Sequence, residues 1–200
     1  MGKITVTKTH IEGLYVIEPT VFGDSRGYFV ETYNQKDMAE AGLTMNFVQD
    51  NQSMSTKGVL RGLHFQKKYP QGKLVRVIRG RVFDVSVDLR QGSATFGQWY
   101  GIELSAENKK QFYISEGFAH GFMVLSDEAE FCYKVTDFYH PDDEGGLAWN
   151  DPEIGIQWPQ LVGEYKGSPS AAGYHLEDGT PLNLSDEDQQ WLGLKDTFSF

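Results

Sequence analysis

The sequence predicts an all-β protein, built as a sandwich or barrel of short strands. In Arg81–Leu89, apolar residues alternate with Asp84, Ser86 and Asp88 at the period of a half-buried strand. Similar short segments recur through the middle of the chain, and helix signals are few. This spacing of strand-like segments is typical of sandwiches and barrels.

The elements follow in chain order. Asn34, with Asp37 three residues later and an end at Gly42, predicts a short capped helix. Near the C-terminus, Ser185 followed by acidic residues predicts a second helix start, so we expect a helical segment over 184–200. Between them, the expected strands are Gly58–Phe65, Leu74–Arg79, Arg81–Leu89, Gln98–Leu104, Gln111–Ile114, Gly121–Leu125 and Ala129–Val135.

The length and the composition predict a single domain over residues 1–200. A chain of 200 residues can bury about 70% of the surface that it exposes when unfolded. Residues 160–183 are rich in Gly, Pro and Ser and lack periodicity, so we expect an irregular excursion over the surface.

The cysteine content and the first residues bear on the compartment. The chain has one cysteine, Cys132, in an apolar strand setting that predicts a packed thiol. A lone cysteine fits a reducing compartment, and Met1–His10 lacks the apolar core of a signal peptide. With no apolar run long enough to span a membrane, we expect a cytoplasmic protein.

The charge distribution indicates a small anionic ligand. A formal net charge of -10 argues against nucleic acid as a partner. Residues 57–90 nevertheless carry nine of the eighteen basic residues, whereas residues 127–153 carry nine acidic residues and only Lys134. A local basic patch on an acidic protein suits a phosphorylated metabolite. The alternative is that these side chains are the solvated faces of strands.

Two histidines are candidates for chemistry. His64 lies on a predicted strand and can project into a barrel interior, and His120 lies in the glycine-flanked run Gly117–Phe122, where backbone can approach a ligand. A barrel metal site of the cupin type needs two histidines two residues apart and a nearby Glu. Because His64 is followed by Phe65 and Gln66, we expect no metal. A satisfied core histidine is the alternative for His64.

Without a metal, a histidine in a barrel suits general acid–base catalysis. Tyr133 is a candidate acid for the opposite side of a substrate, and Lys73 can stabilise the oxygen of an enolate. The alternatives are a core aromatic for Tyr133 and a solvated strand end for Lys73. Together the three groups predict proton transfer beside a carbonyl.

Several long motifs resemble the dTDP-4-dehydrorhamnose 3,5-epimerase family, from about Gly13 to Trp158 and again from Leu184. The resemblance implies a metal-independent cupin-type jelly roll with a few short peripheral helices, no cofactor, and a homodimer with exchanged N-terminal strands. It also implies epimerisation at C3 and C5 of dTDP-4-dehydro-6-deoxy-D-glucose in dTDP-L-rhamnose biosynthesis. The motifs are Asp24–Glu31, Gln49–Ser53, Val59–Gln66, Gly117–Phe122 and Tyr139–Glu144.

The same resemblance implies roles for individual residues. His64 is the base, Tyr133 returns a proton from the opposite face, and Lys73 stabilises the enolate. Asp188 matches the aspartate that orients the base, although Glu187 replaces the family lysine beside it. An acidic residue in the first turn of a helix is the alternative for Asp188. The implied substrate contacts are Arg61, His120, Gln49, Asn51, Tyr139 and Glu144, together with Arg26, Phe29 and Glu31 in the partner subunit's site.

Two questions stay open at this stage. On an ideal strand Arg61 and His64 point to opposite faces, and a bulge at Gly62 would be needed to align them. The function has alternatives too: an epimerase of one centre only, a ketoisomerase of a dTDP-4-keto-6-deoxysugar, or a sugar-nucleotide binding module without catalysis.

Overall fold

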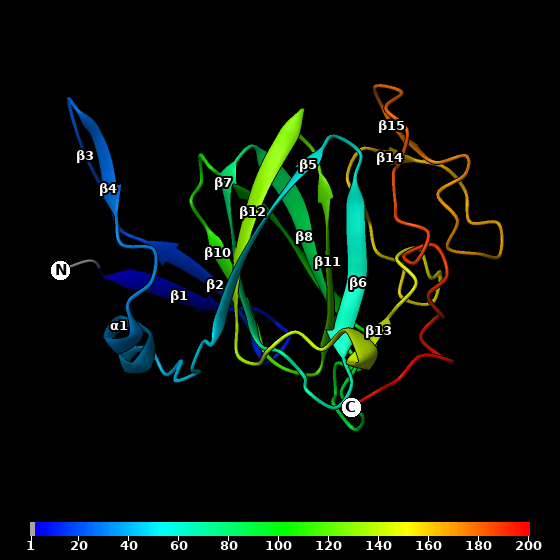
Figure 1. Ribbon diagram of the computed structural model, residues 1–200, viewed down its shortest axis with the longest axis horizontal. Helices are drawn as coiled ribbons and strands as arrows, with labels where there is room; N and C mark the ends of the chain where they lie inside the picture. Colours follow the sequence, from blue (N-terminus) through cyan, green and yellow to red (C-terminus); the bar gives the residue numbers. More distant parts are fainter. Residues whose placement is uncertain (1–2) are drawn as a thin grey trace.

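Two antiparallel sheets face each other in the computed structural model, which describes residues 3–200 (Figure 1). The all-β prediction is therefore confirmed. The six-stranded sheet runs in the order β1 (Ile4–Lys8), β2 (Leu14–Pro19), β10 (Gln111–Ile114), β7 (Lys73–Arg79), β12 (Glu128–Val135) and β5 (Gln49–Thr56). The five-stranded sheet runs in the order β13 (Glu144–Gly146), β6 (Leu60–Gln66), β11 (Phe118–Val124), β8 (Arg81–Asp88) and β9 (Trp99–Ser105).

Apolar side chains from both sheets form the core between them. Phe112 and Phe131 come from the six-stranded sheet, and Val82 and Phe122 come from the five-stranded sheet. The rings of Phe122 and Phe131 stack across the gap with centroids 4.2 Å apart. This apolar packing fills part of the space between the two sheets.

Strand β8 is buried on both faces, whereas its alternating pattern predicts a half-buried strand. Its polar residues Asp84, Ser86 and Asp88 are fully buried, as are Val85 and Val87 on the other face. The outer face is covered because the chain after β13 returns over the five-stranded sheet. A pattern within one strand does not show what the rest of the chain lays over it.

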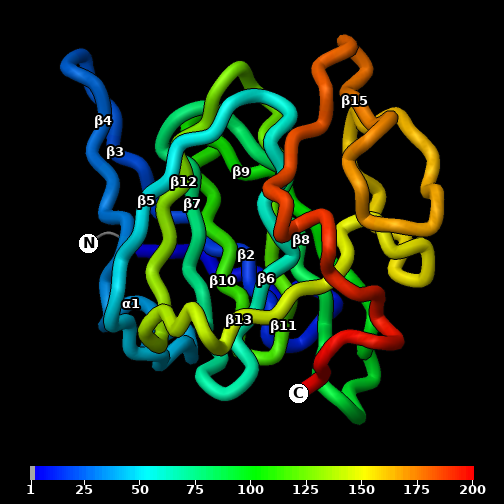
Figure 2. Tube along the Cα trace, turned by 45° about the vertical axis from the view of Figure 1, so that its right-hand side comes forward, coloured from blue at the N-terminus to red at the C-terminus, as the bar shows by residue number. Residues whose placement is uncertain are grey.

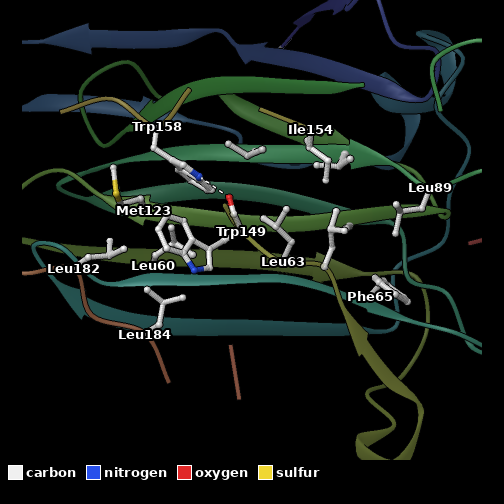
Figure 3. Packing of buried hydrophobic residues seen from close by; sticks show 14 of the residues in the cluster. Leu60, Leu63, Phe65, Leu89, Met123, Trp149, Ile154, Trp158, Leu182 and Leu184 are labelled. Carbon is white, nitrogen blue, oxygen red and sulfur yellow. Dashed lines mark hydrogen bonds between the residues drawn. The ribbon is translucent and has the colours of Figure 1, made fainter. Parts of the chain in front are cut away.

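A second core fills the space under this returning segment (Figure 3). Leu60, Leu63 and Met123 from the sheet pack with Trp149 and Trp158. The indole Nε1 of Trp158 donates a hydrogen bond to the carbonyl of Trp149 at 2.9 Å. The returning segment is therefore packed onto the sheet by its own apolar side chains.

Residues 160–183 are irregular apart from two short paired strands, β14 (Leu161–Val162) and β15 (His175–Leu176) (Figure 2). The helix expected over 184–200 is wrong, since this segment forms turns. Ser185 Oγ does accept from the amide of Asp188, as a helix cap would. The Asp188 side chain, however, turns inward to the sheet, and the chain follows it instead of continuing a helix.

The N-terminal part carries a hairpin and the predicted helix. α1 (Gln35–Glu40) is capped by Asn34, whose side chain accepts from two backbone amides. Far from this part in the sequence, a 3-10 turn, η1 (Pro141–Asp143), precedes β13. The hairpin of β3 (Val21–Asp24) and β4 (Gly27–Val30) extends away from the sandwich (Figure 1). The helix prediction is confirmed.

Two expectations from composition have structural counterparts. Cys132 is a buried free thiol, and burial raises its pKa, as the packed-thiol interpretation expects. Within residues 3–200, no helix has the length and apolar content to cross a membrane. The first two residues of the segment 1–10, which was considered above for a signal peptide, lie outside the described part of the chain.

Candidate active site

A bulge in β6 places the side chains of Arg61 and His64 on the same face. On β11, His120 lies opposite His64 and Phe122 lies opposite Arg61. A step of two residues on β11, from His120 to Phe122, therefore matches a step of three on β6, from His64 to Arg61, so β6 has one extra residue. The extra residue lies at Gly62, whose φ of 123° favours glycine. The bulge at Gly62, which the sequence suggested but could not establish, is therefore present. The side chains of Arg61 and His64 both face the inside of the sandwich.

His64 is bonded to a buried carboxylate from the C-terminal segment. Its Nε2 lies 2.5 Å from Oδ1 of Asp188, and the amide of Gly62 donates to Oδ2 of the same group at 3.1 Å. The indole of Trp191 donates to Oδ1 at 3.1 Å. Burial opposes ionisation of Asp188, but these donors outweigh it and lower its pKa. Asp188 is thus a carboxylate at neutral pH and holds the imidazole by one nitrogen.

Next to His64, His120 forms a second buried pair with Asp84. Both carboxylate oxygens of Asp84 lie 3.0 Å from His120 Nε2. Burial lowers the pKa of His120, and burial also raises the pKa of Asp84 against the opposing effects of His120 and Lys73. Burial thus disfavours the charged form of each group. A neutral His120 imidazole that donates Nε2–H to Asp84 avoids placing a second charge in this buried pair.

Lys73 begins β7, across the sandwich from this pair. Burial lowers its pKa to about 8, although the charges of Asp84 and Glu144 favour the protonated amine. An ammonium in such a position is still charged at neutral pH and carries little water with it. It can therefore act strongly on a nearby developing oxyanion.

Tyr133 and Arg61 lie close to each other at the same end of the sandwich. Tyr133 on β12 is half-buried and pairs with Asn51 on β5. Burial raises the pKa of the Tyr133 phenol, and the positive charge of Arg61 opposes that rise. Arg61 Nε donates to Ser55 Oγ at 2.9 Å, which aims the guanidinium toward β5 and β12. Tyr133 is therefore a protonated phenol, able to donate.

Four of the predicted substrate contacts form a polar rim around these groups. Gln49 donates to Asn51 Oδ1 at 2.9 Å and accepts from the amide of Tyr139 at 3.2 Å. The Tyr139 hydroxyl donates to Glu144 at 3.3 Å. Glu187, which replaces the family lysine, lies close enough to Tyr139 to contribute to raising its pKa, after burial and Glu144.

Three other predicted contacts do not reach this cluster within the chain. Arg26 and Phe29 lie on the projecting hairpin, and the Arg26 guanidinium pairs with Asp24 of the same hairpin at 2.5 Å. Glu31 follows the hairpin and accepts from Asn34 at the start of α1. Phe29 is 65% exposed. One chain by itself does not bring these three residues to His64.

The basic run over 57–90 does not form one patch. Lys57, Arg79 and Arg81 each pair with an acidic residue at the surface, and Arg90 pairs with the buried Asp88. Charges that are close in sequence thus lie on different strands, and only part of the basic run faces the inside of the sandwich. Arg61 is the guanidinium of this run that faces the histidines.

Sequence reasoning did not assign three residues that support this site. Asp84 holds His120, Ser55 holds Arg61 and Trp191 holds Asp188. The polar positions of the alternating strand at Asp84 were a signal for a buried partner. Ser55 and Trp191 had no such signal: each lies within six residues of its partner along the chain, but no pattern in the sequence marks the pair.

Over residues 3–200, no group of three or more His, Cys, Asp or Glu side chains is arranged to hold a metal ion. The acid–base groups that the fold brings together here are an imidazole with a carboxylate partner, a phenol and an ammonium.

A jelly-roll barrel with these groups at one end has the architecture of cupin-type enzymes that move protons at carbon. The comparisons with known proteins specify the class. The family description dTDP-4-dehydrorhamnose 3,5-epimerase matches residues 8–196, and the chain belongs to that family.

Similar proteins carry the same description. A relative from Methanothermobacter thermautotrophicus, named dTDP-4-dehydrorhamnose 3,5-epimerase, is 50% identical over 98% of this chain and 97% of its own length. One from Shigella flexneri with that name is 59% identical over 78% of this chain and 87% of its own length. The crystal structure of dTDP-6-deoxy-D-glucose-3,5-epimerase from Legionella pneumophila, in complex with dTDP-4-keto-L-rhamnose, superposes with a TM-score of 0.84. It is 47% identical and matches 96% of this chain and 94% of that one.

Relatives with a narrower name exist as well. A dTDP-4-dehydrorhamnose 3-epimerase from Streptomyces niveus is 45% identical over 92% of this chain and 81% of its own length. Family membership alone therefore does not separate epimerisation at two centres from epimerisation at one.

Proposed function

We propose that the protein epimerises C3 and C5 of dTDP-4-dehydro-6-deoxy-D-glucose and so forms dTDP-4-dehydro-L-rhamnose for dTDP-L-rhamnose biosynthesis. The observation that carries the proposal is the His64–Asp188 pair, 2.5 Å apart, with Lys73 and Tyr133 on strands of the sheet that faces it. The family match over residues 8–196 supports the choice of substrate.

His64 acts as the base. Since Asp188 is ionised, the Nε2 atom that faces it carries hydrogen, and Nδ1 is left with a free lone pair. Nδ1 takes the proton from the carbon beside the C4 carbonyl. The electrons of the broken C–H bond form the enolate, whose oxygen becomes negative. Asp188 then stabilises the imidazolium without accepting its proton.

Lys73 and Tyr133 complete the reaction. The Lys73 ammonium, with a pKa of about 8, is positioned to stabilise the enolate oxygen at neutral pH. Tyr133 donates its proton to the opposite face of the same carbon, which inverts the centre. His64 and Tyr133 then exchange protons with water, and the cycle is repeated at the second carbon.

The remaining predicted residues bind the substrate in this proposal. Arg61 and His120 hold the sugar and the diphosphate, and a bidentate guanidinium–phosphate contact contributes about 1.5–3 kcal/mol. The rim residues Gln49, Asn51, Tyr139 and Glu144 contact the sugar nucleotide. Arg26, Phe29 and Glu31 contact the nucleotide in the site of a second copy.

A homodimer with exchanged N-terminal strands explains the projecting hairpin. Phe22, Tyr28 and Phe29 on this hairpin are all largely exposed, and an isolated two-stranded hairpin is marginally stable in water. A second chain would cover these side chains and bring Arg26 to His64.

Mixing two inactive variants tests the shared site. In a mixed dimer of R26A and H64A chains, one of the two sites has both native residues. With random pairing, about a quarter of wild-type activity should return. If activity stays at the level of the separate variants, Arg26 does not serve the partner's site.

We also propose that the enzyme needs no cofactor, since acid–base side chains supply every step above. A cytoplasmic location fits the single buried thiol of Cys132. A single domain over residues 1–200 predicts one cooperative unfolding transition, whereas separate melting of residues 160–183 would contradict it.

Proton NMR in deuterated water tests the reaction directly. The protein is incubated with dTDP-4-dehydro-6-deoxy-D-glucose, and a reductase with NADPH then traps the product. We expect deuterium at both C3 and C5 and trapping as dTDP-L-rhamnose. H64A should exchange neither centre, while H175A, a histidine in the outer excursion, should behave as wild type.

The 3-epimerase relative favours a second candidate, a single-centre epimerase. Deuterium at one carbon only would select it. Exchange at neither carbon, with tight binding of the sugar nucleotide, would instead indicate a binding module.

A further inference from the structure

The indole of Trp191 shares its acceptor with the His64 imidazole. Trp191 Nε1 donates to Oδ1 of Asp188 at 3.1 Å, and His64 Nε2 lies 2.5 Å from the same oxygen. The two rings meet edge to face, with centroids 6.2 Å apart and planes at 76°. Trp191 therefore contacts both members of the pair.

The backbone of β13 makes room for this ring. Gly146 lies opposite His64 in the sheet, and a Cβ atom at Gly146 would come within 2.1 Å of the Trp191 ring. Only a glycine at this position lets the indole lie flat against the strand. The ring is thus held in place by the sheet as well as by its hydrogen bond.

The donors around Asp188 are few and specific. The residue is 4% exposed, so water contributes little to its solvation. Its hydrogen bonds come from the Gly62 amide on Oδ2 and from Trp191 and His64 on Oδ1. Removing the indole N–H takes away one of three donors and leaves more of the carboxylate's negative charge to act on His64.

We propose that Trp191 is a positioning residue, whose indole N–H fixes the Asp188 carboxylate and limits the basicity of the His64 base. The proposal rests on the proposed roles of His64 and Asp188. It adds that Trp191 sets the pH above which His64 is deprotonated and can act as the base. Without this N–H, His64 holds its proton more tightly and needs a higher pH to become an active base.

Other charged and titratable groups of the site, Glu187 of the C-terminal segment included, come from several elements and are the same in all variants. They are His120 on β11, Asp84 on β8, Lys73 on β7, Tyr133 on β12, Glu144 on β13 and Arg61 on β6 itself. A change confined to Trp191 leaves each of them in place, and the ionisation of the substrate is also common to all variants.

The test is the pH dependence of kcat/KM in Trp191 variants. W191F keeps an aromatic ring without the donor. Replacement of Trp191 by benzothienylalanine keeps the shape of the indole and removes only the N–H, so it serves if W191F does not fold. W158F is the matched control, because Trp158 also loses an indole hydrogen bond, to the Trp149 carbonyl.

For both Trp191 variants, we expect the acidic limb of the kcat/KM profile to move to higher pH by about 0.5–1 unit. At a pH well below this limb, kcat/KM should then be about 3- to 10-fold lower than in the wild type. An NMR titration of the His64 ring should move in the same direction. W158F should leave the limb in place even if its melting temperature falls.

The outcomes separate this inference from the proposed function. If D188N and H64N leave turnover unchanged, the proposed base itself is wrong. If those two variants abolish turnover but both Trp191 variants keep the wild-type limb and titration, Trp191 only packs the segment, and the inference is overturned.

Discussion

The burial of Lys73 leads to a quantitative prediction of the pH dependence of catalysis. The pKa of its ammonium falls from 10.5 to about 8, so the folded protein disfavours the charged form by about 3 kcal/mol relative to the same group in water. The group is then about 90% protonated at pH 7 and about 10% protonated at pH 9. Because the enolate oxygen needs the charged form, kcat/KM should fall above about pH 8.

Two substitutions at Lys73 test this reasoning with the reductase-coupled assay. K73M should lose about 10²- to 10³-fold in kcat, since one electrostatic donor to the oxyanion is removed. K73R keeps its charge across the accessible range, so whatever activity remains should lack the basic limb. K110M, at a half-buried lysine just before β10 whose ammonium lies 3.9 Å from Glu18, is the control and should keep both the rate and the profile.

The same burial predicts the effect on stability, with the opposite sign. Between about pH 8 and 10.5 the unfolded chain holds the Lys73 proton more tightly than the folded chain, so the contribution of this group to stability rises with pH. At pH 7, K73M should therefore raise the free energy of unfolding, by up to about 3 kcal/mol. Guanidinium unfolding measures it. An active K73M, or a basic limb that persists in K73R, would refute the assignment of Lys73 as the enolate stabiliser.

Three further variants probe the base, the acid and the bulge. D188N should lower kcat by about 10³-fold or more, because the amide cannot balance the imidazolium charge; a loss below tenfold in the coupled assay would contradict this role. Y133F should slow inversion by about 10²- to 10⁴-fold while deuterium still enters the substrate, so parallel loss of exchange and inversion by NMR would argue against Tyr133 as the acid. G62A should cost at least 2 kcal/mol, roughly, since its Cβ would lie 2.8 Å from the Gly121 Cα at a φ of 123°. G42A, also at positive φ but with open space around it, should cost only about 1 kcal/mol in denaturant unfolding.

Much of the fold was predictable from local patterns. The strand periodicity of Arg81–Leu89 and the cap at Asn34 depend on neighbouring residues, and the structure confirms both elements. The helix expected over 184–200 failed for the opposite reason. Its start signal at Ser185 is local, but Asp188 is bound by β6 and the chain is drawn onto the sheet.

The sequence by itself determined the chemical groups of the site, because His64 stands in one of the motifs whose order indicates the family, and that resemblance implies the roles of Lys73 and Tyr133. Tertiary structure alone decided how these groups work together. The bulge at Gly62 places Arg61 and His64 on the same face, and a C-terminal segment with no strand or helix of its own brings Asp188 and Trp191 to His64. A periodic pattern records which face a side chain takes on its own strand. The partner of that side chain depends on contacts between segments more than a hundred residues apart, as in the His64–Asp188 pair with its separation of 124.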